Sequence, residues 1–228
     1  QSRNRAAEFM AKAVRAQCFI NTSIETENLL SHGVVECENA LALYHILDAP
    51  GWREPREWSL FPSSERGQLA ESARELLRLL AAGRVRANSA RPEILREALD
   101  LLDRADAIAL LPPSRAVGID RARYLTELGS SHLAQAARDR ALAIPLASAR
   151  DHYQLATAIA RRGTPKQTRL ALEEIEKALA LDPLHYWSWL QRGICHTDLG
   201  DLVAAAGDFG RCVGLWPEFA WGHFNLGV

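Results

Sequence analysis

Long apolar stretches, a charge surplus of either sign and clustered cysteines are all missing from this 228-residue sequence. No apolar run approaches the roughly 20 residues that cross a bilayer, so we expect no membrane insertion in this segment. The formal net charge is −1, and this balance argues against binding to nucleic acid, whose phosphates attract basic surfaces. With 48% hydrophobic and 24% charged residues, the composition is that of an ordinary globular protein.

The sequence also lacks a pattern typical of a metal site. The four cysteines are Cys18, Cys37, Cys195 and Cys212, and no pair has CxxC spacing. We predict that they are reduced thiols buried in the core. His185, His196 and His223 lie near two of them in sequence, but these offsets do not bring four ligands onto one helix face. We therefore expect no metal and no cofactor.

Catalytic patterns are equally scarce. Ser130-Ser131-His132 follows Gly129, and capping of a helix N-terminus explains these residues completely. Cys37 lies between Glu36 and Glu38, and acidic neighbours raise the pKa of a thiol, which disfavours a nucleophile. We predict that this region is not an enzyme.

The sequence does contain a repeat of 34 residues. Pro183 and Pro217 are 34 positions apart, and Tyr153, Trp187 and Trp221 recur at the same interval. Between the prolines, apolar residues recur every three or four positions, which predicts helices with one buried stripe. A helix pair of this size cannot bury its apolar faces alone, so the period predicts stacked pairs.

Four residues within this unit, 184–217, predict where its two helices end and touch. Gly200 can adopt the left-handed conformation that ends the first helix, and Asp201 can cap the second. Gly193 and Ala205 are small, which suits points where two helices approach closely. The unit therefore reads as helix, turn and helix.

This pattern resembles the tetratricopeptide repeat (TPR) family. The family's large aromatic falls on Trp189 and its second-helix aromatic on Phe209, whereas Arg192, His196 and Cys212 replace the usual leucine, tyrosine and alanine. The resemblance implies an all-α fold, a right-handed superhelical solenoid of TPR-like helix-turn-helix repeats. It also implies a protein-binding role, without naming a partner.

We predict one continuous solenoid with two parts. Residues 1–113 form degenerate helical repeats. One of their helices begins at a capping box, Thr22 to Glu25, and ends near Gly33. Residues 114–228 fit the repeat better, and the last repeat is truncated. Because there is no initiator methionine and Val228 lies inside a new helix, we expect a piece of a longer protein. We also expect self-association through the truncated repeat, and we favour the cytoplasm for this segment.

The segment 49–64 interrupts the helical pattern with three prolines. It also carries Trp52, Trp58, Leu60 and Phe61, and disordered linkers seldom contain so many large apolar residues. We predict that this loop packs its aromatic side chains onto the helices. The alternative is a docking peptide for a partner.

In the TPR family, the second, fifth and ninth positions of each first helix line a concave groove. The resemblance therefore nominates these peptide-groove candidates: Tyr153, Trp187, Leu190, Ile194, Trp221 and Phe224. Such an apolar lining favours an amphipathic helix or an apolar peptide. The alternative is that these residues pack against the next helix. Because residues two apart on a helix point about 200° apart, we predict that Trp187 faces the groove and Trp189 the core.

A second resemblance concerns the less regular half. The stretches 47–52, 60–66 and 75–81 are similar to the region after the catalytic domain in planctomycete-type bacterial serine/threonine kinases. No Gly-rich loop, VAIK, HRD or DFG motif of a kinase occurs in this chain. We predict a non-catalytic scaffold that binds a protein or peptide. The alternative is a regulatory or substrate-recruiting C-terminal region of such a kinase.

Overall fold

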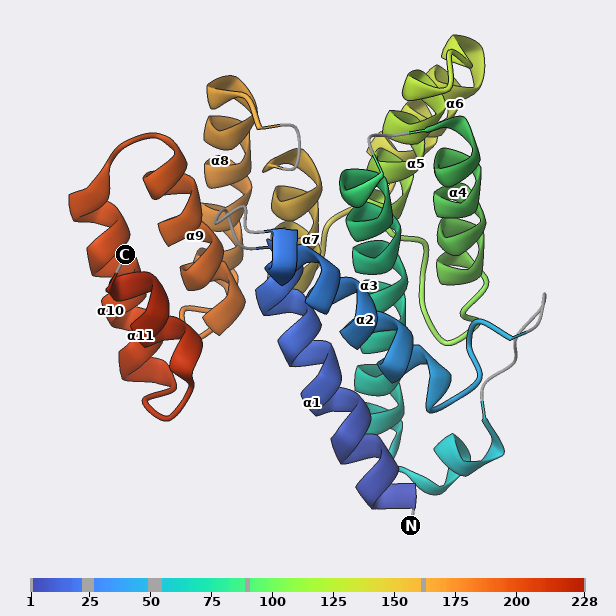
Figure 1. The fold of residues 1–228 in the computed structure, drawn as a ribbon, viewed down its shortest axis with the longest axis horizontal. Helices are drawn as coiled ribbons and strands as arrows, with labels where there is room; N and C mark the ends of the chain where they lie inside the picture. The colour runs from blue at the N-terminus through green and yellow to red at the C-terminus, as the bar shows by residue number, and fades with distance from the viewer. Residues whose placement is uncertain (1, 22–26, 49–54, 89–90, 161–162, 228) are drawn as a thin grey trace. The chain divides into compact units, whose positions relative to one another are not determined.

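The computed structural model describes residues 2–21, 27–48, 55–88, 91–160 and 163–227 (Figure 1). These residues form α-helices and their connections, and no β-strand occurs among them. The chain divides into two compact units, residues 1–140 and 141–228. The predicted all-α class is confirmed, while a superhelical path through both units and a change in repeat character at residue 114 remain predictions.

Unit 1 is built around one long helix. Its elements are α1 (Ser2–Asn21), α2 (Glu27–Ala42), the 3-10 helix η1 (Arg56–Leu60), α3 (Ser63–Ala87), α4 (Pro92–Asp106), α5 (Arg115–Glu127) and most of α6 (Ser131–Leu142). α3 packs against α1, α2 and α4. Every α3 residue from Leu69 to Gly83 except Glu71 is buried, as expected for a helix with neighbours on several sides.

The predicted helix end at Gly33 is wrong, because α2 continues through it as one helix. A Cβ atom at residue 33 would lie 2.6 Å from Cγ1 of Ile20 and 3.0 Å from Cβ of Phe19, both on α1. The glycine therefore permits close approach of α1 and α2 rather than ending a helix. The predicted capping box at 22–25 lies outside the described residues.

The described part of the 49–64 loop confirms the prediction that its aromatic residues pack inward. Trp58 and Phe61 are buried, and the Trp58 ring meets the Tyr44 ring edge to face at 5.3 Å. Tyr44 makes a similar contact with Phe9 of α1 at 5.2 Å. Leu60, which is not aromatic, is 76% exposed. Residues 49–54, including Trp52, lie outside the described part of the chain.

Unit 2 consists of helix pairs with the predicted period. Its helices are α7 (Ala149–Ala160), α8 (Pro165–Leu181), α9 (Tyr186–Asp198), α10 (Leu202–Leu215) and α11 (Ala220–Leu226). α8 and α10 end 34 residues apart, and α9 and α11 begin 34 residues apart. α7 packs on α8, α9 on α10, and α8 on α9, so each pair covers the apolar face of the next.

The predicted turn chemistry is present in unit 2. Gly200 has a φ of 80°, the left-handed conformation that glycine adopts without steric cost. The side chain of Asp201 then accepts a hydrogen bond from the amide of Ala204 at 3.1 Å. Thr164 caps α8 in the same way, accepting from the amide of Gln167 at 3.2 Å. These caps satisfy amides that lack a partner inside the helix.

Candidate functional site

Three of the six groove candidates are core residues in this structure. Tyr153, Leu190 and Ile194 are each less than 5% exposed. Leu190 and Ile194 belong to a cluster with Phe209 of α10, because their side of α9 is the side that α10 covers. The prediction that these three residues line an open surface is therefore corrected: they pack.

The other three candidates remain accessible. Trp187 and Trp221 are half-buried, and Phe224 is 41% exposed. Trp187 and Trp221 both lie against the core cluster of α9 and α10, as equivalent positions of successive helices should. The Trp221 and Phe224 rings are stacked with centroids 5.0 Å apart. A binding role for these residues stays a prediction.

Sequence reasoning missed three aromatic residues that extend this surface. The rings of Trp216 and Phe219 are stacked, with centroids 4.3 Å apart. Tyr186 meets both rings edge to face, at 5.7 and 5.5 Å. The Trp187 ring contacts Tyr186 at 5.3 Å. These contacts join the first turn of α9 to the loop before α11, and aromatic residues on either side of Pro217 were the signal available in the sequence.

We call this group the aromatic surface, and it consists of Tyr186, Trp187, Trp216, Phe219, Trp221 and Phe224. Trp216 is 42% exposed, and the remaining members other than Phe224 are half-buried. Single exposed apolar residues are normal on a soluble protein, whereas larger exposed apolar patches are typical of interaction sites. Large, rigid aromatic rings are also the residues that dominate binding energy at interfaces.

Trp189 is half-buried, as Trp187 is, so the predicted contrast between a groove-facing Trp187 and a core Trp189 does not appear in their burial. Trp189 packs against both core clusters of unit 2, and its indole Nε1 donates a hydrogen bond to the carbonyl of Pro183 at 2.8 Å. The guanidinium of Arg192 lies 4.3 Å from the ring centroid and that of Arg211 lies 5.4 Å away. Cation–π attraction therefore adds to the packing.

Arg192 and His196, which depart from the TPR pattern, share one buried carboxylate. Arg192 donates to Oδ1 of Asp208 at 2.7 and 3.0 Å, and His196 Nδ1 lies 3.0 Å from Oδ2. Arg192 also reaches Glu176 of α8 at 2.8 Å. Burial alone would lower the pKa of Arg192, but its hydrogen bond to Asp208 raises it. The group ties α8, α9 and α10 together, and the contacts of its members account for it without catalysis.

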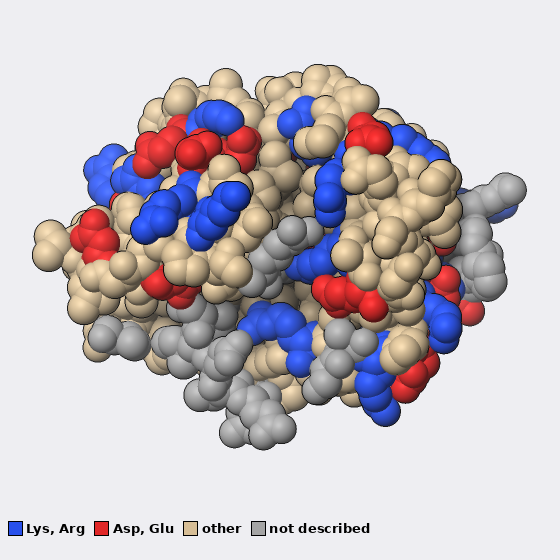
Figure 2. Space-filling model, turned by 90° about the horizontal axis from the view of Figure 1, so that it is seen from above, with Lys and Arg blue, Asp and Glu red and all other residues tan. Residues whose placement is uncertain are grey.

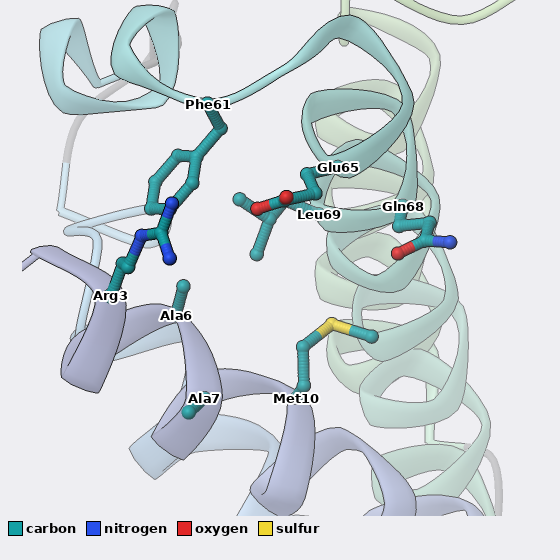
Figure 3. A pocket seen from close by; sticks show the side chains of 8 residues that line it. All are labelled: Arg3, Ala6, Ala7, Met10, Phe61, Glu65, Gln68 and Leu69. Carbon is teal, nitrogen blue, oxygen red and sulfur yellow. The ribbon is translucent and has the colours of Figure 1, made fainter.

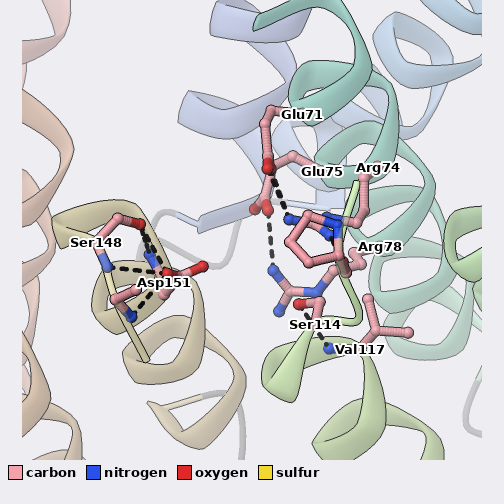
Figure 4. Close-up of polar contacts among 10 residues, drawn as sticks. Glu71, Arg74, Glu75, Arg78, Ser114, Val117, Ser148 and Asp151 are labelled. Atoms are coloured by element: carbon pink, nitrogen blue, oxygen red, sulfur yellow. Dashed lines mark hydrogen bonds and ion pairs between the residues drawn. The ribbon is translucent and has the colours of Figure 1, made fainter. Parts of the chain in front are cut away.

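A second polar network lies within unit 1 (Figure 4). Arg78 of α3 is fully buried and contacts Glu75 at 2.9 Å and Asp120 of α5 at 3.0 Å. Burial by itself would lower the pKa of Arg78, but the two carboxylates raise it. Nearby, Arg74 binds Glu71 at 2.8 Å and the carbonyl of Pro112 at 2.8 Å. The buried charge of Arg78 is thus compensated, and removing one of its partners would leave an uncompensated charge in the interior.

The prediction of reduced, buried thiols is confirmed, and the surface charges of both signs are mixed. On the face in Figure 2, lysine and arginine side chains are interspersed with aspartate and glutamate. All four cysteines are buried with free thiols, and burial raises the pKa of Cys195 and of Cys212 to about 12. Within the described ranges, no cluster of three or more His, Cys, Asp or Glu residues could hold a metal ion. None of the helices described has the length and apolarity to span a membrane.

Comparison with known proteins shows a similarity to solved structures, but none to a protein family. No protein-family model and no curated protein matches this chain, so the predicted resemblance to the kinase-associated region receives no support. The chain is similar to the crystal structure of YrrB, described as a TPR protein with an unusual peptide-binding site. The two share 18% identity over 89% of each chain, with a TM-score of 0.42.

Proposed function

We propose that this protein is a non-catalytic interaction module whose aromatic surface binds an apolar or amphipathic peptide segment of another protein. The observation that carries this proposal is a set of six aromatic residues in unit 2, two of which, Trp216 and Phe224, are more than 40% exposed. Four of the rings, Tyr186, Trp187, Trp216 and Phe219, contact one another, and Trp221 and Phe224 form a stacked pair. Helix pairs that stack by a fixed period provide the rigid support that such a surface needs. Peptide helices with apolar anchors at helical spacing are natural ligands for it.

The charge distribution supports an apolar rather than an ionic contact. The groups nearest the aromatic surface in sequence are His185, Glu218 and His223, which do not form a field of one sign. We therefore expect the affinity for the peptide to change by less than about tenfold between 50 and 500 mM salt, because few ions would be released on binding.

A peptide-display selection against the whole chain tests this proposal. Selected peptides should be rich in apolar residues, and Trp187→Ala and Phe224→Ala should each weaken their binding by about 30-fold or more, the effect of losing a hot-spot residue. The matched control is Val203→Ala, because Val203 is 87% exposed on α10 and lies outside the aromatic surface. Equal binding by all three variants would refute the proposed site.

Stability must be measured together with affinity, because Trp187 also contributes to the packing of unit 2. Its ring packs on the core cluster of α9 and α10 and touches two other rings. Aromatic pairs contribute about 0.5–1.5 kcal/mol each, so Trp187→Ala should cost about 1–3 kcal/mol of unfolding free energy rather than the near-zero cost of a fully exposed residue. Binding assays at a temperature where circular dichroism shows full folding separate the two effects.

A further inference from the structure

Unit 1 contains a cavity that the proposed interaction role does not use. It has a volume of about 350 Å³ and is lined by eight residues: Arg3, Ala6, Ala7, Met10, Phe61, Glu65, Gln68 and Leu69 (Figure 3). The α1 residues follow the spacing i, i+3, i+4 and i+7, and the α3 residues follow i, i+3 and i+4. Each set therefore lies on one helix face, and the two faces meet at the cavity.

The lining has an apolar floor and a polar rim. Phe61 and Leu69 are buried, and Met10 is half-buried. Arg3, Glu65 and Gln68 are exposed. In Figure 3 the side chains of Arg3 from α1 and of Glu65 from α3 both extend toward the space between the two helices. The rim thus offers a positive group and a negative group on different helices.

The rim charges are available to a ligand. The other basic residues of α1 are paired: Arg5 binds Glu57 at 2.7 Å, and Lys12 and Arg15 both reach Glu36. Among the residues that the structure describes, neither Arg3 nor Glu65 has an ion pair within 4 Å. A cavity of this size lies at the small end of the range for small-molecule sites, about 300–1,000 Å³. It suits one compact ligand better than a long segment.

From this arrangement we propose that the cavity binds a free amino acid with a bulky apolar side chain, such as phenylalanine or leucine. The apolar side chain occupies the floor formed by Met10, Phe61 and Leu69. The ligand carboxylate pairs with Arg3 and its ammonium group with Glu65. Charge complementarity selects the zwitterion, because a ligand with only one of these charges leaves one rim group without its partner.

Isothermal titration or ligand-observed NMR on the whole chain tests the site with four probes: L-phenylalanine, 3-phenylpropionate, phenethylamine and L-serine. L-phenylalanine should bind most tightly. The two single-charge analogues should bind about two- to fivefold more weakly, since an exposed ion pair contributes little. L-serine should bind at least about tenfold more weakly, because it lacks the apolar group. Absence of L-phenylalanine binding, or equal binding of the first three probes, would overturn the proposal.

Two matched pairs of variants locate the binding. Ala6→Leu places extra carbon atoms in the cavity and should abolish binding, whereas Ala11→Leu, at an exposed position of the same helix, should preserve it. Glu65→Gln should remove the preference for L-phenylalanine over 3-phenylpropionate, whereas Glu93→Gln, at an exposed position of α4, should keep that preference. If Ala6→Leu and Ala11→Leu bind alike while both remain folded, the ligand does not occupy this cavity.

Discussion

The contact between Gly193 and Phe209 allows a direct test of the packing in unit 2. A Cβ atom at residue 193 would lie within 2.8 Å of three atoms of the Phe209 ring. That ring is 5% exposed and belongs to the core cluster, so it cannot swing away into solvent. Gly193→Ala should therefore force α9 and α10 apart, and overpacking of this kind costs about 1–3 kcal/mol.

Alanine is also more favourable than glycine inside a helix, by about 1 kcal/mol. This gain in stability must be separated from the cost of the steric clash. Gly210 of α10 supplies the control, because it is exposed and a Cβ atom there would meet nothing within 4 Å. Gly210→Ala should stabilise the protein by about 0.5–1 kcal/mol. Since both variants receive the helical gain, the difference between them isolates the clash, and Gly193→Ala should be less stable than Gly210→Ala by about 1–3 kcal/mol.

Urea unfolding followed by circular dichroism measures this difference, and a thermal melt should show a separation of about 2–4 °C per kcal/mol for a chain of this size. A double-mutant cycle with Phe209→Leu adds a second criterion. The smaller side chain gives room for the new methyl group, so the two substitutions together should cost less than the sum of their separate costs. If Gly193→Ala proves as stable as Gly210→Ala, then α9 and α10 do not approach each other as closely at residue 193 as we infer.

Three further predictions concern buried polar groups. Asp120→Ala should cost about 3–5 kcal/mol, measured by urea unfolding, because it removes a partner of the fully buried Arg78. Cys195 and Cys212 should resist iodoacetamide at pH 8 in the native protein and react after unfolding, since burial raises the pKa of each to about 12 and suppresses the thiolate; fast native labelling seen by mass spectrometry would contradict this. Burial lowers the pKa of His185 below its ordinary value near 6.5. The unfolded chain therefore takes up this proton first, and stability should be lost as the pH falls from about 6.5 through the folded-state pKa. His185 Nδ1 caps α9 by accepting a hydrogen bond from the amide of Ser188 at 3.3 Å. His185→Asn, which can still cap the helix, should remove this part of the loss between pH 7.5 and 5.

Local sequence rules were sufficient for the helices of unit 2 and their turns. The 34-residue period predicted the helix pairs, because each pair buries its apolar faces against its neighbours and uses similar residues at equivalent positions to do so. Gly200 and Asp201 act as predicted, since a left-handed turn and a helix cap depend only on neighbouring backbone atoms. Trp189 was assigned to packing for a similar reason, because its place within the repeat determines which helices surround it.

Contacts between residues far apart in the sequence determined the features that local sequence rules did not predict. Gly33 signals a helix end when only its neighbours are considered, but Ile20 lies against it in the folded chain and requires a glycine inside the helix. Ile194, which the repeat register placed in a groove, is buried instead, because the width of an open groove depends on how closely successive pairs pack. The cavity of unit 1 joins Met10 to Leu69, and no local pattern links residues so far apart. Periodicity thus reports which face of a helix is apolar, while the tertiary structure alone determines what covers that face and how much of it stays open.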